Sequence, residues 1–121
     1  MTVEDEDDTR ELLVVVLEQQ GATVEAAASC AEALVILERM TPDVLVSDIG
    51  LPGADGYELI RAVRARTKAG MMLPAIALTA YARREDRRLA LEAGFQAHVA
   101  KPVDPVELVA TVAEWAKREQ A

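Results

Sequence analysis

The sequence contains one cysteine, Cys30, and one histidine, His98, within 121 residues. A single cysteine excludes an internal disulfide and any multi-cysteine metal site, and a single histidine excludes a two-histidine metal site. Aromatic side chains number four, which disfavours a stacking platform for bases or sugars. Disulfide scaffolds and thiolate or imidazole metal centres are therefore set aside.

Long apolar runs and an excess of basic charge are also missing. The longest apolar run, Leu12–Leu17, is far shorter than the about 20 residues of a membrane-spanning helix, and the acidic start is unlike a secretory signal. The net charge of −8 disfavours binding to nucleic acid or to anionic membranes through bulk electrostatics. We expect a reduced, soluble, cytoplasmic protein with no direct nucleic-acid binding and no membrane insertion.

The composition and length of the chain indicate a single globular domain, residues 1–121. Hydrophobic residues make up 51% of the chain, which argues against disorder. Beginning from Val3, short apolar runs at 23–24, 44–46, 75–78 and 98–100 alternate with longer helical patterns. This alternation predicts a mostly parallel sheet with helices on both faces.

Capping residues and glycines predict the ends of five helices. The first helix is expected from an Asp8–Glu11 capping box to Gly21, and the second from a Ser29–Glu32 box to before Pro42. The third should start near Asp55, with Arg61, Arg64 and Arg66 facing outward. The fourth should span about Arg83 to Glu92 and end before Gly94, and the fifth should start at Asp104 with Pro105 in its first turn. The caps favour a helix for Leu12–Leu17, which leaves Val14 or Val15 facing water or a partner.

Polar side chains follow the apolar runs at the points where the strands should end. Glu4 and Asp5, Asp48, Thr79 and Lys101 each stand at such a point, and the carboxyl ends of parallel strands form the usual ligand edge. Three carboxylates repel unless a cation joins them, and Lys101 with Mg²⁺ would balance their charge. The sequence therefore predicts a site for a divalent cation and a phosphoryl group.

The order of these residues carries a family resemblance. Glu4-Asp5, then Asp48 followed by Pro52 and Gly56, then Thr79-Ala80, then Lys101-Pro102 resembles the receiver domain of two-component response regulators, over essentially the whole chain. The resemblance implies a flavodoxin-like (βα)5 doubly wound sheet in strand order 2-1-3-4-5. Because only three residues precede Glu4, the first strand is expected to be truncated.

The resemblance also implies roles for individual residues. Asp48 would be the phosphoacceptor, with Thr79 and Lys101 on the phosphoryl oxygens. Mg²⁺, with Mn²⁺ as a substitute, would be held by Asp5, Asp48, the backbone carbonyl of Gly50 and, through a water, Glu4. Thr79 and His98 would form the switch, Gly50 and Tyr81 would tune the lifetime of the aspartyl phosphate, and the Lys101–Pro102 bond would be cis.

The implied partners are a histidine kinase or a histidine phosphotransfer protein as phosphoryl donor, and an effector. The effector would read the fourth helix, the fifth strand and the fifth helix, a surface that includes Arg83, Arg87 and Trp115. The chain would be a phosphoacceptor that assists its own phosphorylation and dephosphorylation, rather than an enzyme. It would be either a free-standing receiver or a part of a longer protein such as a hybrid histidine kinase.

Three other functions remain open from the residues. A haloacid dehalogenase-type phosphohydrolase also combines Asp, Thr, Lys and Mg²⁺, but Gly50 stands where its second Asp would be. A receiver-like interaction module without phosphorylation would not need the complete acidic, Thr and Lys set. A nucleotide-binding flavodoxin-like protein is disfavoured because Gly50, Gly53 and Gly56 match neither a dinucleotide fingerprint nor a P-loop.

Overall fold

The computed structural model describes residues 1–51, 55–66, 73–80 and 84–120, and of 117–120 only the backbone. Within these residues the chain forms a five-stranded parallel sheet in the order β2-β1-β3-β4-β5. The strands are β1 (Thr2–Val3), β2 (Ala26–Ala27), β3 (Leu45–Asp48), β4 (Ala75–Thr79) and β5 (Ala97–Ala100). The predicted flavodoxin-like order 2-1-3-4-5 is confirmed.

The position of β2 corrects a prediction. The short apolar run Thr23–Val24 was expected to form this strand, but the strand lies at Ala26–Ala27. Backbone pairing with β1 fixes the position of β2, since the Thr2 amide donates to the Glu25 carbonyl at 2.9 Å and the Glu4 amide donates to the Ala27 carbonyl at 3.0 Å. Val24 instead packs against the core under one helix layer.

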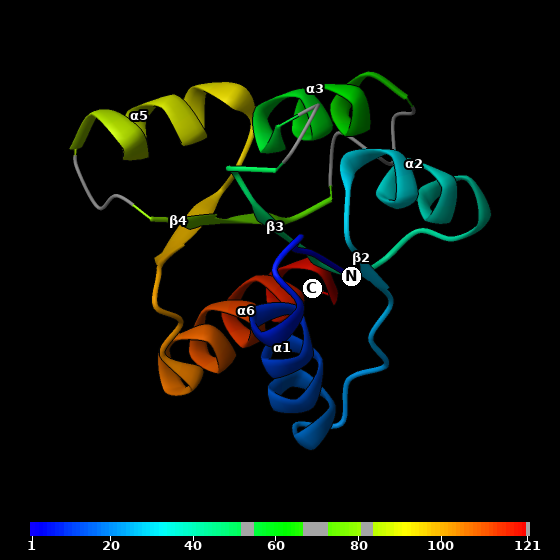
Figure 1. Cartoon of the computed structure of the whole chain (residues 1–121), viewed down its shortest axis with the longest axis vertical. Helices are drawn as coiled ribbons and strands as arrows, with labels where there is room; N and C mark the ends of the chain where they lie inside the picture. The colour runs from blue at the N-terminus through cyan, green and yellow to red at the C-terminus, as the bar shows by residue number, and fades with distance from the viewer. Residues whose placement is uncertain (52–54, 67–72, 81–83, 121) are drawn as a thin grey trace.

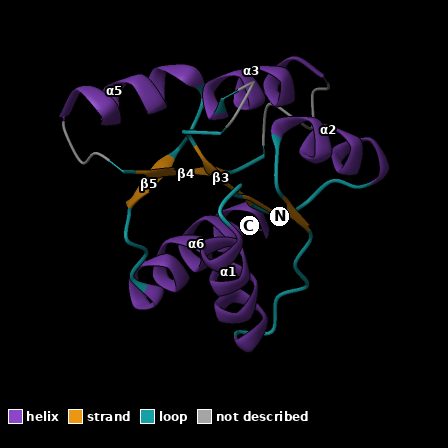
Figure 2. Cartoon of the chain, in the orientation of Figure 1, coloured by secondary structure: helices purple, strands orange, loops and turns teal. Residues whose placement is uncertain are grey.

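Two helix layers cover the sheet (Figures 1 and 2). The helices α1 (Asp7–Gln19) and α6 (Pro105–Gln120) lie on one face, and α2 (Cys30–Arg39), α3 (Gly56–Arg66) and α5 (Arg84–Ala93) lie on the other. Each layer has its own buried core, one built around Leu13, Ile76 and Leu108 and one around Leu45, Leu59 and Ile60. None of the helices described here combines the length and the apolar character that a membrane crossing requires.

Most predicted helix ends are confirmed. The Ser29 hydroxyl accepts the Glu32 amide at 3.2 Å, and Asp104 accepts the Val106 amide at 2.9 Å. Gly21 and Gly94 adopt positive φ after α1 and α5, which glycine permits without strain.

The start of α1 differs from its prediction. Asp8 is already helical, and the cap is Glu6, whose carboxylate accepts the Asp8 and Thr9 amides. The chain leaves the sheet directly after Glu4 and must turn at once, so the earlier acid of the run takes the capping position. The run Leu12–Leu17 is helical as predicted, with Val15 45% exposed.

Arg64 was expected to face outward with Arg61 and Arg66, and this expectation is wrong for Arg64. Its guanidinium donates to the carbonyls of Gly94 and Leu73 and, at 2.9 Å, to the Gln96 side chain. Because α3 lies beside the start of β4 and the turn before β5, a long side chain there can satisfy carbonyls that the sheet leaves unpaired. Burial lowers the pKa of Arg64.

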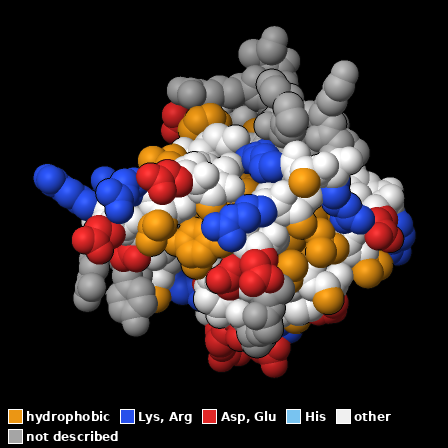
Figure 3. Space-filling model, turned by 90° about the horizontal axis from the view of Figure 1, so that it is seen from above, with side chains coloured by type: hydrophobic (Ala, Val, Ile, Leu, Met, Phe, Trp, Pro, Cys, Tyr) orange, Lys and Arg blue, Asp and Glu red, His pale blue; other side chains and the backbone are white. Residues whose placement is uncertain are grey.

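The outer surface of the α2–α3–α5 layer is mixed in character. In Figure 3, acidic, basic and hydrophobic side chains lie interspersed on this face rather than in separate patches. On α5, Leu89 and Leu91 are exposed beside Arg87 and Arg88. Charges of both signs therefore share this face with exposed apolar side chains.

Candidate functional site

The predicted site residues gather at the carboxyl edge of the sheet. Asp48 is the last residue of β3 and Thr79 the last of β4, while Glu4 follows β1 and Lys101 follows β5. Asp48 pairs with Leu78 in the register, and the Lys101 amide donates to the Thr79 carbonyl at 2.8 Å. Parallel strands thus place four polar side chains at one edge, as the sequence predicted.

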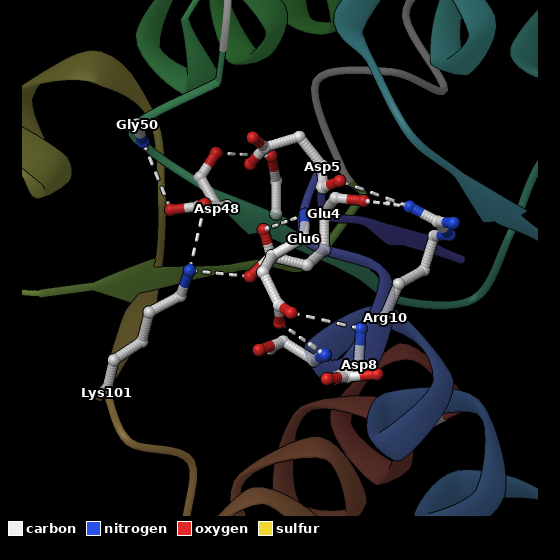
Figure 4. Close-up of polar contacts among 10 residues, drawn as sticks. Glu4, Asp5, Glu6, Asp8, Arg10, Asp48, Gly50 and Lys101 are labelled. Atoms are coloured by element: carbon white, nitrogen blue, oxygen red, sulfur yellow. Dashed lines mark hydrogen bonds and ion pairs between the residues drawn. The ribbon is translucent and has the colours of Figure 1, made fainter.

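Lys101 joins two of the carboxylates (Figure 4). Its ammonium nitrogen Nζ lies 2.9 Å from Asp48 Oδ2 and 2.5 Å from Glu4 Oε1. The other Asp48 oxygen, Oδ1, accepts the backbone amide of Gly50 at 3.1 Å. Both Asp48 oxygens are therefore held by donors, and the carboxylate orientation is fixed.

The three acids form a cluster suited to a hard cation. Carboxylate oxygens of Glu4, Asp5 and Asp48 lie within 4.8 Å of one another. Glu4 and Asp48 are buried, whereas Asp5 is exposed at the mouth of the site. Three carboxylates and one ammonium leave a formal charge of −2, and oxygen ligands are those that Mg²⁺ prefers. The residues present thus fit a divalent cation.

The surroundings shift the pKa values of Glu4 and Asp48 in opposite directions. Burial, with the nearby Asp48, raises the pKa of Glu4 to about 7, although Lys101 opposes this. Burial acts in the same direction on Asp48, but bonds from Lys101, Glu4 and Gly50 outweigh it and hold the Asp48 pKa below its ordinary value. The two carboxylates outweigh burial to raise the pKa of Lys101. Asp48 is therefore anionic at neutral pH.

Some of the remaining predicted residues are described by the structure, and others are not. Thr79 is buried, and the Lys101–Pro102 peptide bond is cis, as the resemblance implied. His98 is half-buried on β5, where its Nε2 accepts a hydrogen bond from Arg87 Nε of α5 at 3.0 Å. Trp115 packs against the core beneath α1 and α6. Pro52, Gly53, Tyr81 and Arg83 lie outside the described residues.

Gly56 belongs to the site through its backbone. A Cβ added at Gly56 would lie 2.7 Å from the Ile49 Cα and would also collide with the Asp48 carbonyl oxygen. The Gly56 amide donates to the Ile49 carbonyl at 2.9 Å. Only a residue without a side chain lets α3 begin this close to the end of β3, which explains the glycine in the motif.

Sequence reasoning missed Arg10, which lies beside the acidic turn. Its Nη1 donates to the Glu4 carbonyl at 3.1 Å and to the Asp5 carbonyl at 3.4 Å (Figure 4). Arg10 could have been noticed in the sequence because it is a cation close to the amino end of a helix, where the helix dipole disfavours positive charge. A residue placed against that preference indicates a specific local contact.

Comparison with known proteins agrees with this geometry. A family model for the response regulator receiver domain matches residues 1–113. The chain is 52% identical to an uncharacterized 14.6 kDa protein of Leptolyngbya boryana, over 95% of this chain and 87% of that protein. It is 39% identical to the transcriptional regulatory protein CreB of Escherichia coli K12 over 96% of its own length, but it spans only 49% of CreB.

A solved structure adds a comparison of the fold. The receiver domain of sensor histidine kinase PA1611 from Pseudomonas aeruginosa PAO1, with a magnesium ion coordinated in its active site cleft, superposes with a TM-score of 0.87. The two sequences are 34% identical, and the match covers 96% of this chain and 94% of that one. The chain is therefore a member of the response regulator receiver domain family.

Proposed function

We propose that Asp48 accepts a phosphoryl group from a phosphohistidine, and that the domain works as the acceptor in a two-component phosphorelay. The observation that carries this is the state of Asp48, an anionic carboxylate at the end of β3 with both oxygens held by Lys101 and Gly50. A fixed anion at the open edge of a sheet is positioned for in-line attack on phosphorus.

The transfer balances with the residues present. One Asp48 carboxylate oxygen attacks the phosphorus, the P–N bond to the donor imidazole breaks, and the imidazole leaves with the bonding electrons and takes up a proton. Asp48 becomes an acyl phosphate. Lys101 already contacts Asp48 Oδ2 at 2.9 Å, so its ammonium needs only a small movement to bind a phosphoryl oxygen. Thr79 ends the adjacent strand and supplies a hydroxyl to the same group.

Asp5, Asp48, the Gly50 carbonyl and, through a water, Glu4 are the proposed ligands of Mg²⁺, with Mn²⁺ as a substitute. The clustering of the three carboxylates within 4.8 Å supports this assignment. The bound ion would neutralise negative charge that would otherwise repel the incoming phosphoryl group. Gly50 and Tyr81 are the proposed positions that set how long the acyl phosphate survives. Gly50 offers no side chain to orient a water, and Tyr81 is bulky enough to restrict one, so slow hydrolysis of the acyl phosphate is expected.

The proposed output surface is formed by α5, β5 and α6. Phosphorylation would draw the Thr79 hydroxyl toward Asp48 and leave room for His98 to turn inward from β5. His98 now contacts Arg87 of α5, so its movement would change the surface that an effector reads. The donor is proposed to be a histidine kinase or a histidine phosphotransfer protein, and the domain itself is proposed to turn over no other substrate.

Treatment with acetyl phosphate, followed by intact-mass and peptide mass spectrometry, tests the proposal. We expect an addition on Asp48 that requires Mg²⁺ and disappears in EDTA. Asp48→Asn should abolish it, while Asp43→Asn, at an exposed acid before β3, should leave it unchanged. Labelling of Asp48→Asn to the same extent as the parent chain, or equal labelling in EDTA, would overturn the proposal.

A further inference from the structure

We propose that Arg10 is a positioning residue for the metal site, and that its guanidinium fixes the backbone turn that carries Glu4 and Asp5 over Asp48. The inference rests on the function proposed above. Arg10 Nη1 donates to the Glu4 carbonyl at 3.1 Å and to the Asp5 carbonyl at 3.4 Å. One side chain therefore contacts the backbone of both neighbouring acids (Figure 4).

Helix geometry explains how Arg10 reaches this turn. Side chains on an α-helix tilt toward its amino end, and Arg10 stands three residues after the start of α1 at Asp7. Its guanidinium thus extends back over residues 4–7. The Arg10 side chain is only 26% exposed, although it lies at the edge of a surface turn. This position is opposed by the helix dipole, so the contacts with the turn must hold it there.

The ion pair with Asp7 does not account for the placement. Arg10 Nη2 lies 2.6 Å from Asp7 Oδ1, but the Asp7 side chain is 85% exposed. An exposed pair three residues apart on one helix contributes little. The two carbonyl contacts are made by Nη1 rather than by the paired Nη2, and they join Arg10 to the backbone of the two acids of the site.

The turn needs such a contact because its two acids are anchored unequally. Glu4 is fully buried, and its amide is fixed by the Ala27 carbonyl at 3.0 Å. Asp5 is exposed beyond the end of β1, so packing does not fix its backbone. The Arg10 bond to the Asp5 carbonyl limits the orientations of that peptide and hence of the Asp5 carboxylate. A ligand held in place before binding loses less freedom when the ion arrives.

Simple electrostatics makes the opposite prediction. Arg10 is a cation next to a site for a cation, so its removal should strengthen Mg²⁺ binding if its charge were all that mattered. If Arg10 positions the turn, its removal should weaken Mg²⁺ binding. The sign of the change therefore separates the two explanations.

Isothermal titration with Mg²⁺ alone provides the measurement, on the whole chain and on three variants. Arg10→Gln removes the charge and the paired donors, and Arg10→Lys keeps the charge but loses the planar guanidinium. Arg66→Gln is the matched control, since Arg66 also donates to a carbonyl, that of Leu34 at 3.1 Å, and pairs with a carboxylate, that of Glu38 at 3.0 Å, away from the site.

We expect Arg10→Gln to weaken Mg²⁺ binding by about tenfold, the lower end of what loss of a supporting contact does at metal sites. Arg10→Lys should weaken it by less, and Arg66→Gln should leave it unchanged. Equal or tighter Mg²⁺ binding by Arg10→Gln would overturn the inference. So would an equal weakening by Arg66→Gln, because that would show a general effect on folding.

Phosphorylation by acetyl phosphate supplies a second readout. If Arg10 acts only on the metal ligands, the rate for Arg10→Gln should recover to near that of the parent chain at saturating Mg²⁺. A rate that stays low at saturation, in a variant with an unchanged melting temperature, would contradict this role. Failure of the parent chain to bind Mg²⁺ would instead refute the proposed function, so the two failures are distinguishable.

Discussion

Arg87 Nε donates a hydrogen bond to His98 Nε2 at 3.0 Å, which ties α5 to β5. An accepting Nε2 requires an imidazole that is neutral and carries its hydrogen on Nδ1. His98 is the only histidine of the chain, so its ring signals can be assigned without ambiguity. This contact therefore gives a direct probe of the surface proposed to carry the output.

The pKa of His98 should lie below its ordinary value of about 6.5. Burial is the main cause, followed by the charge of Arg87, while Glu107 opposes them. NMR titration of the imidazole should show the Nδ1–H tautomer at neutral pH. Arg87→Ala should raise the pKa, and Arg88→Ala, on the same helix and paired with Glu92, should not. An Nε2–H tautomer would contradict the contact.

The sign of the linkage follows from a lowered pKa. Between the folded and the unfolded pKa of His98, the unfolded chain binds more protons, so this group contributes stability that is present above about pH 6.5 and is lost as pH falls through the folded value. His98→Gln should reduce the slope of melting temperature against pH in that window.

Glu4 should give the opposite dependence on pH. Its pKa is raised to about 7 in the folded chain, so the folded state binds more protons between about pH 4.5 and 7. Without Mg²⁺, stability from this group is therefore present below pH 4.5 and is lost as pH rises through 7. Urea unfolding in EDTA at pH 5.5 and pH 8 measures the difference.

The same titration should affect metal binding. Since Mg²⁺ favours ionised carboxylates, its affinity should rise between pH 5.5 and pH 8, with proton release that depends on Glu4. In Glu4→Gln, stability without metal should no longer fall as pH rises, and most of the proton release on Mg²⁺ binding should disappear. An affinity independent of pH in the parent chain would show that Glu4 is already ionised in the folded state.

Thr2→Val should stabilise the fold. Thr2 is fully buried in β1, and its hydroxyl has no hydrogen-bond partner among the described residues. Replacing a buried, unpaired hydroxyl with a methyl group of similar shape removes a desolvation penalty of about 1 kcal/mol. Thr111→Val is the control, because the Thr111 hydroxyl donates to the Glu107 carbonyl at 2.8 Å. Urea denaturation should show a higher midpoint for the first variant only.

Gly56→Ala should destabilise the fold by about 2 kcal/mol or more, since the added Cβ meets backbone atoms that cannot rotate away. Gly50→Ala provides the comparison. The atom nearest to a Cβ at Gly50 is Asp48 Oδ1 at 3.9 Å, an ordinary van der Waals distance. Thermal unfolding should separate the two variants clearly, and equal melting temperatures would refute the close approach of α3 to β3.

The sequence predicted those features whose causes are local. The alternation of apolar runs predicted the layers, and the Ser29 and Asp104 caps bond as expected. One contact between distant segments, that of Asp48 with Lys101, was also predictable, because parallel strands share one carboxyl edge.

Other features that depend on contacts between distant segments were not predictable from the local sequence pattern. The position of β2 depends on how its backbone pairs with Thr2 and Glu4 rather than on the strand preference of Val24. Arg64 looks like a surface residue in the helical pattern, but Gly94, thirty residues later, provides its carbonyl partner. The role proposed for Arg10 likewise depends on where the turn after β1 lies relative to α1.

The two contacts of Lys101 make it an internal counter-ion. Its ammonium lies between Asp48 and Glu4, so the pocket can fold with part of its negative charge already balanced by the chain. If Mg²⁺ were bound by these carboxylates as proposed, the Lys101 ammonium would be free to contact the phosphoryl group. Because Lys101 directly follows β5, replacement of the Lys101 ammonium by Mg²⁺ at these carboxylates would act first on β5, the edge strand that carries His98.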